Sequence, residues 1–303
     1  KILASEYFIF DGYLESVNDI ETRFREGMVK QIIVFEPDFG YRLMREKSAD
    51  IQLIADASDA NTANLVVNYT SAIIQEYMLG LQADAGGLLR IEPEIRMMYN
   101  ESLKGAFMFV PGVMALILMI VSALMTSITI TREKEMGTME TLLVSPLRPL
   151  QIILGKVTPY VVLSFVNAVT IVVMGYFVFG LPVHGSLALL LFECLLFISV
   201  ALTLGIFIST MVETQQMAMF FSMMMLMLPT ILLSGFIFPV ENMPEILQWI
   251  SYIVPAKYFI IIVKSIMLKG TGMAFVWKET LVLIFMMLFF IANSVRRFKI
   301  RLA

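Results

Sequence analysis

The sequence is most strongly constrained by long apolar runs that alternate with short groups of charged residues after residue 105. A helix rises about 1.5 Å per residue, so roughly 20 apolar residues cross the hydrocarbon core of a bilayer, which is about 30 Å thick. Several runs reach that length, and the sequence therefore predicts an α-helical polytopic membrane protein. The five expected spans are 107–130, 152–179, 187–210, 217–238 and 275–295.

Composition separates a first domain from this membrane part. Hydrophobic residues make up 58% of the chain and charged residues 16%, whereas soluble proteins carry about 25% charged residues. Charges of both signs are frequent up to Lys104 and occur only in small groups from Ala106 onward. We therefore expect a water-exposed domain over 1–105 and a transmembrane domain over 106–303. The net charge of −3 gives no indication of a nucleic-acid partner.

The first domain has the pattern of a small α/β fold. Strands are expected over 28–35, around the alternating Ile51, Leu53 and Ala55, and over 88–99. A long amphipathic helix between the last two strands begins with Ser58 or Asp59 as its cap. The residues expected on its buried face are Val66, Tyr69, Ile73 and Tyr77, flanked by Ile74 and Met78.

The stretch 246–268 is apolar enough for a sixth crossing, but Pro255, Lys257 and Lys264 interrupt it. With five crossings, the basic residues of 132–156 and 296–301 fall on one side of the membrane, as the positive-inside rule requires. We therefore expect 239–270 to form short helices that re-enter the outer leaflet, and 1–105 to lie outside the cytoplasm. The residues expected to shape this outer gate are Pro239, Glu241, Pro244 and Pro255.

A polar segment over 131–149 lies between two apolar runs and belongs at the membrane face, because its charges cannot lie in hydrocarbon. A charge run alone is usually a solvated loop, so the order of residues matters more here than the charge. That order is Arg132-Glu133-Lys134-Glu135-x-Gly137-Thr138-x-Glu140-x-Leu142-Leu143-Val144-Ser145-Pro146-Leu147, followed by Ile152-Ile153-Leu154-Gly155-Lys156.

This segment resembles the cytoplasmic coupling segment of ABC-2 type permeases, the membrane subunits of ATP-binding cassette exporters. A second stretch, Leu228-Pro229-x-x-Leu232-Leu233-Ser234-Gly235-Phe236-Ile237-Phe238-Pro239-Val240-Glu241-Asn242-Met243-Pro244, resembles the last outer-face segment of the same family. The resemblance runs from about Tyr99 to the C-terminus, and over 1–100 it is one of layout only. It implies the subgroup with a large extracytoplasmic domain after a first membrane helix, and we expect that helix upstream of Lys1 as a sixth span.

The resemblance also implies partners and a location. A cytoplasmic ATPase subunit is expected to hold ATP and Mg²⁺, and a second permease subunit, identical or different, is expected beside this one in a bacterial cytoplasmic (inner) membrane. The residues that the resemblance places at the ATPase contact are Arg132, Glu133, Lys134, Glu135, Gly137, Thr138, Glu140 and Pro146.

Residues for chemistry are scarce in this sequence. His184 is the single histidine and Cys194 the single cysteine, so a two-histidine zinc motif, a His-based triad and a Cys-based metal site are all excluded within the chain. The sequence also has no Gly-x-x-x-x-Gly-Lys-Ser/Thr phosphate loop, and we expect neither ATP hydrolysis nor a cofactor in this chain. A secondary transporter or channel, and after it a membrane-bound enzyme, are the alternatives. They are disfavoured because intramembrane charges are few and no acid/base pair can be named.

The substrate path is expected between two protomers. Six methionines within 217–227 precede Pro229, which interrupts the hydrogen-bond ladder of the helix and favours a bend. Methionine is flexible and adapts to varied apolar molecules, although it equally faces lipid or fills a core. Glu193, about two turns inside its span, either contacts substrate or a dimer partner or reaches back to the outer interface. The residues expected along the path are Met217, Met224, Met227, Pro229 and Glu193, with the helix from Phe107 as a facing wall.

Overall fold

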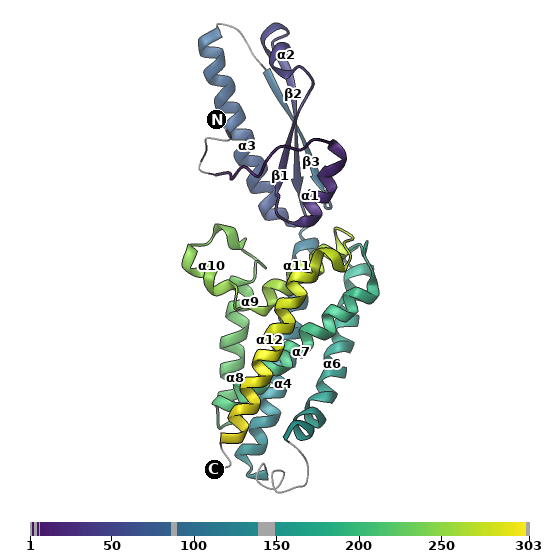
Figure 1. The fold of residues 1–303 in the computed structure, drawn as a ribbon, viewed down its shortest axis with the longest axis vertical. Helices are drawn as coiled ribbons and strands as arrows, with labels where there is room; N and C mark the ends of the chain where they lie inside the picture. The colour runs from purple at the N-terminus through teal and green to yellow at the C-terminus, as the bar shows by residue number, and fades with distance from the viewer. Residues whose placement is uncertain (1, 3–4, 6, 86–89, 139–148, 301–303) are drawn as a thin grey trace. The chain divides into compact units, whose positions relative to one another are not determined.

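The computed structural model describes residues 2, 5, 7–85, 90–138 and 149–300. The chain divides into two compact units, Lys1–Phe107 and Met108–Ala303, and each is described by itself (Figure 1).

The first unit is a three-stranded sheet with helices on both faces. Its strands lie in the order β1-β2-β3, with β1 antiparallel and β3 parallel to the central β2. The parallel pair requires a crossover connection, which α3 supplies. The elements are η2 (Val17–Asp19), α1 (Ile20–Glu26), β1 (Gln31–Phe35), α2 (Phe39–Arg45), β2 (Ser48–Asp56), α3 (Ala60–Ala85) and β3 (Arg90–Met98).

The alternation in β2 sends its side chains to two different cores. Ile51 and Leu53 pack with Ile74 of α3, whereas Ile54 packs with Phe24 of α1 on the opposite face. A strand buried on both faces in this way is the expected centre of a small α/β sheet. The predicted alternation of Ile51, Leu53 and Ala55 on one face is therefore confirmed.

The predicted buried face of α3 is wrong by one residue position, which corresponds to about 100° of helix rotation. Ala63, Val67, Thr70 and Ile74 are the buried residues, whereas the expected Tyr69 and Tyr77 are each 40% exposed. Small residues let a helix approach a sheet closely, and tyrosine is often only half-buried because its hydroxyl needs water or a partner. The start was predicted correctly, since the Asp59 carboxylate accepts a hydrogen bond from the Thr62 N–H at 3.1 Å.

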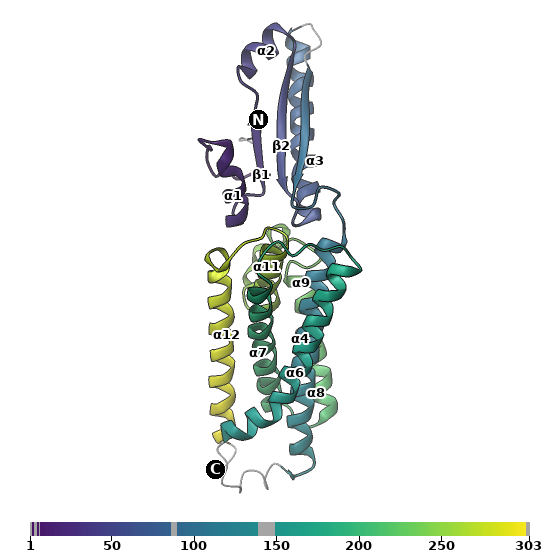
Figure 2. The same cartoon turned by 90° about the vertical axis from the view of Figure 1, so that its right-hand side faces the viewer.

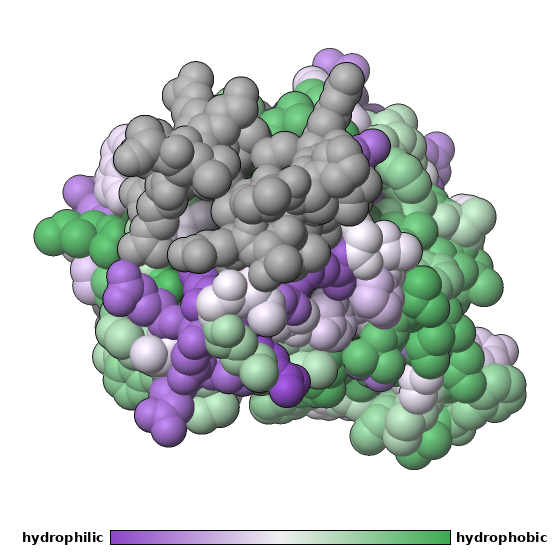
Figure 3. Space-filling view, turned by 90° about the horizontal axis from the view of Figure 1, so that it is seen from below, coloured by the Kyte–Doolittle hydropathy of each residue, from purple (hydrophilic) through white to green (hydrophobic). Residues whose placement is uncertain are grey.

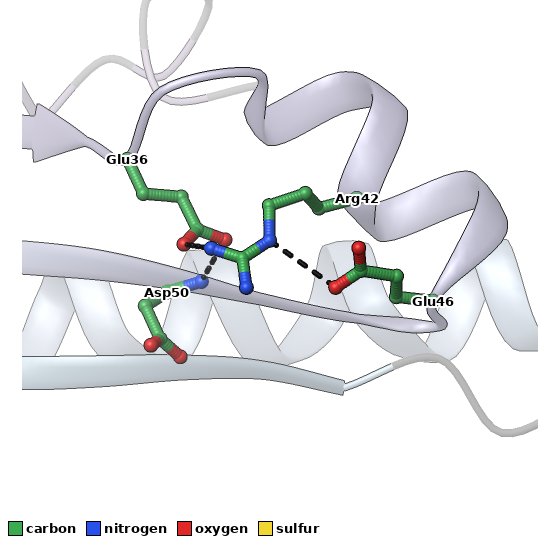
Figure 4. A network of polar contacts seen from close by, with 4 residues as sticks. All are labelled: Glu36, Arg42, Glu46 and Asp50. Atoms are coloured by element: carbon green, nitrogen blue, oxygen red, sulfur yellow. Dashed lines mark hydrogen bonds and ion pairs between the residues drawn. The ribbon is translucent and has the colours of Figure 1, made fainter.

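A polar network ties α2 to the strands that flank it (Figure 4). The Arg42 guanidinium forms ion pairs with Glu36 and with Glu46, the latter at 3.2 Å. The Asp50 N–H donates to Glu36 at 2.9 Å. Exposed ion pairs of this kind contribute at most about 1 kcal/mol each, so the network fixes the position of α2 rather than forming a site.

The second unit is a bundle in which five helices are long and apolar enough to cross a membrane: Ala106–Glu135, Gly155–Phe177, Leu187–Met211, Gln215–Leu233 and Met273–Ser294. Together with the small sheet, this confirms the predicted fold class of a polytopic helical membrane protein with an α/β part. The elements are α4 (Ala106–Glu135), α6 (Pro149–Phe177), α7 (Leu187–Met211), α8 (Gln215–Ser222), η3 (Met223–Met227), α9 (Leu228–Leu233), η4 (Val240–Asn242), α10 (Glu245–Ser251), α11 (Pro255–Met267) and α12 (Met273–Ile300).

Helix α7 lies at the centre of the bundle, between α4, α6 and α12 (Figure 2). Its Phe197 ring stacks on Phe259 of α11 with centroids 4.1 Å apart. At Gly205 it approaches α4 so closely that a Cβ would lie 2.4 Å from the Ala123 carbonyl oxygen. Small residues at such crossings permit the tight backbone packing on which helix association in lipid depends.

The fourth span contains a wide turn that the sequence did not predict. Residues Met223–Met227 form a π-helical segment between the α-helical segments α8 and α9. Pro229 lacks an N–H, and its ring clashes with the carbonyl four residues earlier in an ordinary helix. The π-helical segment ends two residues before Pro229, and both prolines and π-bulges are places where helices bend. The helix then ends at Leu233, whereas the prediction extended it to Phe238.

Residues after the fourth span form short helices with a sharp bend. Helices α10 and α11 meet at 79°. The 13 residues of α11 extend about 20 Å at the usual helical rise, which is too short to cross the hydrocarbon core alone.

Candidate functional site

The best-defined polar site of the second unit lies at the C-terminal end of α4. The C-terminal end of α4, the beginning of α6 and the C-terminal part of α12 lie at the same end of the bundle in both side views (Figures 1 and 2). Seen from below, hydrophilic residues gather beside the grey residues, with apolar surface next to them (Figure 3). We call Glu133, Lys134 and Glu135 with their partners the α4 junction.

Two consecutive residues of the α4 junction contact two different helices. The Lys156 ammonium of α6 forms an ion pair with Glu133 at 2.7 Å, and the two side chains are 20% and 30% exposed. The Lys134 ammonium donates to the backbone carbonyl of Ser209 near the end of α7. Consecutive helical residues point about 100° apart. Glu133 and Lys134 therefore face different sides of α4 and contact different helices.

The third residue contacts the beginning of α8. The Glu135 carboxylate accepts hydrogen bonds from both the backbone N–H and the side-chain amide of Gln215, each at 3.0 Å. Helix starts carry partial positive charge and helix ends partial negative charge. Glu135 at the start of α8 and Lys134 at the end of α7 both match that polarity, so the junction is held by helix-end electrostatics as well as by an ion pair.

A left-handed turn follows the junction directly. Gly137 has φ +71°, a conformation that a β-branched residue adopts only with strain. The Thr138 hydroxyl contacts Glu133 at both its carboxylate and its carbonyl oxygen, the latter at 3.3 Å. Arg132 is exposed. The structure therefore brings together six of the eight residues expected at the ATPase contact, and Glu140 and Pro146 lie outside the described residues.

Hydroxyl pairs between α4 and α6 were missed by the sequence analysis. Ser122 contacts Ser164 at 2.8 Å, and Thr129 contacts Tyr160 at 2.6 Å. Serine and threonine within an apolar run act as glue between membrane helices, so their presence inside predicted spans was the available signal. These pairs fix α6 against the helix that carries the junction.

The methionine segment faces outward from the bundle. Met224 is 54% exposed, whereas Ala218, Ser222 and Leu226 form the buried stripe at helical spacing. Helix α4 lies beside α8 in both side views and has its own exposed apolar stripe. That stripe contains Phe109, Val113 and Ile117. The expected path residues Met217, Met224, Met227 and Pro229 thus share one continuous segment with an apolar outer face.

Glu193 does not share that face. It is fully buried, and its Oε1 lies 2.8 Å from the Thr280 hydroxyl of α12. Within this chain, the described side-chain hydrogen bond of Glu193 is therefore with a neighbouring helix. Glu279 of α12 is a second, half-buried carboxylate, which the sequence analysis passed over although it lies within a predicted span.

The outer segment is held by its own side chains. Each of the three expected gate prolines lies at the start of a helix: Pro239 before η4, Pro244 before α10 and Pro255 at the first position of α11. Lys257 donates to the Ser251 hydroxyl at 3.0 Å and lies over the Tyr252 ring at 3.8 Å. Glu241 lies in η4. These contacts fix the bend between α10 and α11.

Among the described residues, no group of three or more His, Cys, Asp or Glu side chains is arranged to hold a metal ion. The five candidate spans and the α4 junction define the class of this protein. It is a multi-pass helical membrane protein whose spans are joined by a charged junction at one end.

Comparison with known proteins gives the family. The family described as ABC-2 family transporter protein matches residues 2–296. Two relatives from Escherichia coli (strain K12) are named as probable multidrug ABC transporter permeases. YbhR is 34% identical over 266 residues, 88% of this chain and 72% of the relative. YbhS is 31% identical over 280 residues, 91% of this chain and 72% of the relative.

A third E. coli K12 relative, the inner membrane transport permease YhhJ, is 28% identical over 276 residues, 88% of this chain and 72% of the relative. No solved structure matches significantly. The chain belongs to the ABC-2 transporter family and is thus a membrane component of an ABC transporter.

Proposed function

We propose that this chain is the permease subunit of an ATP-driven exporter in a bacterial inner membrane. A separate cytoplasmic ATPase binds ATP and Mg²⁺, a second permease subunit completes the pore, and the first unit lies on the extracytoplasmic side. The names of the relatives, which include multidrug permeases and an inner membrane permease, support this assignment. They also favour chemically varied, largely apolar substrates.

The observation that carries the proposal is the α4 junction. A force applied at the turn of Gly137 and Thr138 reaches α6 through Glu133, α7 through Lys134 and α8 through Glu135, because each contact is direct. An ATPase docked at this turn therefore acts on four helices at once. This is what a subunit without its own phosphate loop needs.

The apolar outer faces of α4 and of the methionine segment support a path between two permease subunits. Flexible methionine side chains adapt to varied apolar shapes. Apolar helices that part and close again need no polar channel within one subunit. The outer segment, fixed at its bend, then acts as a lid that moves as one piece.

Charge reversal at the junction tests the coupling. In the transporter reconstituted with its ATPase, Glu135→Lys and Gly137→Val should each lower substrate-stimulated ATPase activity and transport several-fold. The first places positive charge at the start of α8, and the second strains a left-handed turn. Glu15→Lys, at an exposed position of the first unit, is the matched control and should behave as wild type.

Subunit assembly is measured in parallel by co-purification at equal expression. Loss of assembly or loss of stimulation both support a coupling role. If both junction variants assemble, hydrolyse ATP and transport like the control, the segment is an ordinary loop and the proposal fails.

A further inference from the structure

Glu193 belongs to a chain of two hydrogen bonds through the Thr280 hydroxyl, and an ionised Glu193 does not supply enough protons for both of them. The Thr280 Oγ1 lies 2.8 Å from Glu193 Oε1 and 2.9 Å from the Val276 carbonyl oxygen. A threonine hydroxyl has a single proton to donate, and both a carbonyl and an ionised carboxylate only accept. With Glu193 ionised, one of these two contacts therefore lacks a proton.

Protonation of Glu193 supplies the missing proton, so that both hydrogen bonds can form. The acid then donates from Oε1 to Thr280, and Thr280 donates to the Val276 carbonyl, so that each contact has its own proton. The second oxygen, Oε2, is buried and has no partner among the described residues. In the neutral acid Oε2 is a carbonyl oxygen, which is far less costly to bury without a donor than half of a carboxylate charge.

Among the described residues, Glu193 has no ion pair that would compensate for ionisation. On the elements packed against α7, the charged residues are Lys278, Glu279, Arg296, Arg297 and Lys299 of α12, Lys257 and Lys264 of α11, Lys156 of α6, and Arg132, Glu133, Lys134 and Glu135 of α4. The only described hydrogen bond of Glu193 is the one with Thr280, and it has no described ion pair. The Lys134 partner Ser209 lies 16 residues further along α7, about 24 Å away at the usual helical rise.

We propose that Glu193 is a buried proton-binding site, occupied at neutral pH, whose neutral acid group ties α7 to α12 through the Thr280 hydroxyl. Glu193 is a positioning residue in this role. The inference rests on the buried chain from Glu193 to Val276 and is independent of the proposed function.

Difference infrared spectroscopy of the full chain in lipid nanodiscs at neutral pH tests this inference. Wild type minus Glu193→Gln should show the carbonyl-stretch band of a protonated carboxylic acid, shifted in D₂O. Glu279→Gln, at the neighbouring half-buried carboxyl, is the matched control and should leave that band in place. Thr280→Val should move the band to higher frequency, because it removes the hydrogen-bond partner at nearly constant volume.

Thermal unfolding gives the second readout. A glutamine amide can donate to Thr280 as the acid does, so Glu193→Gln should keep a melting temperature close to wild type, while Glu193→Ala should lower it. If Glu193→Gln removes only carboxylate bands, Glu193 is ionised and the proposal is overturned. Should Glu193→Gln not accumulate, the Thr280→Val comparison decides: an unchanged acid region overturns the proposal, and a shifted band supports it.

Discussion

Gly205 shows how a single absent side chain sets the distance between two helices. The position of its missing Cβ lies 2.4 Å from a backbone oxygen and 2.9 Å from the Cα of Ala123. Backbone atoms cannot rotate away as a side chain does, so α4 and α7 must separate to admit even a methyl group.

Gly205→Val should therefore destabilise the protein by about 1 to 3 kcal/mol, the usual range for overpacking a core. Gly155→Ala in α6 is the control, because a Cβ there meets no described atom within 4 Å and alanine favours helix. Thermal unfolding in detergent, followed by tryptophan fluorescence, measures both variants. Equal melting temperatures for the two would show that α4 and α7 are not packed as described.

The sequence placed Glu193 about two turns inside its span but could not identify its partner. Thr280 lies 87 residues further along the chain, and helical spacing says nothing about which helices meet. The same limit explains α3, where tyrosines suggested a buried face that belongs to smaller residues. Periodicity predicts that a helix has a buried side, whereas the packing of the opposing sheet decides which side it is.

At the level of elements, the ion pair between Glu133 and Lys156 joins α4 to α6 on either side of residues 139–148. Glu133→Lys and Lys156→Glu should each lower transport, because each places two like charges together at the junction. The double variant should recover part of the loss. Double-mutant cycles on partly exposed pairs give about 0.2 to 1 kcal/mol, so the expected recovery in melting temperature is small but measurable.

Transport and unfolding are both measured for the four proteins of this cycle. Additive effects, with no recovery in the double variant, would mean that the two side chains do not interact. A recovery in stability without recovery in transport would assign the pair to folding alone.

Helix positions were predictable because apolar runs of about 20 residues leave few alternatives. The wide turn at Met223–Met227 was not, although Pro229 was recognised as an interruption. A proline in the sequence shows that the hydrogen-bond ladder of the helix is interrupted. Whether the helix then bends or forms a wider turn depends on the neighbouring helices. The α4 junction was indicated by the residue order of the coupling segment, and its contacts with three other helices required the structure.

At the level of the whole molecule, the number of crossings fixes the side on which each segment lies. Cysteine replacements at Gly12, His184, Ser145 and Arg297, in a Cys194→Ala background, test the arrangement with a membrane-impermeant thiol reagent. The first two positions should react from outside intact cells, and the last two only after permeabilisation. Labelling of Ser145→Cys from outside would overturn the five-crossing topology.

The proposed path between subunits is tested at Met224, which is 54% exposed on the outer face of the methionine segment. Met224→Cys should form a disulfide-linked or reagent-linked dimer and stop transport until the link is reduced. Ala218→Cys, at a buried position of α8 in the same span, is the matched control and should not cross-link. Full transport by the linked Met224→Cys dimer, or no linkage at any position from 217 to 228, would place the path elsewhere.

The wide turn in the fourth span keeps two halves of a helix in phase. A π-helical turn holds one residue more than an α-helical turn, so removing one residue from Met223–Met227 would close the wide turn and leave α9 at nearly the same rotation relative to α8. Adding a residue instead would rotate α9 by about 100° and move the buried Thr230 and the 46% exposed Leu232 from their present sides. The fourth span should therefore tolerate a deletion in this segment better than an insertion.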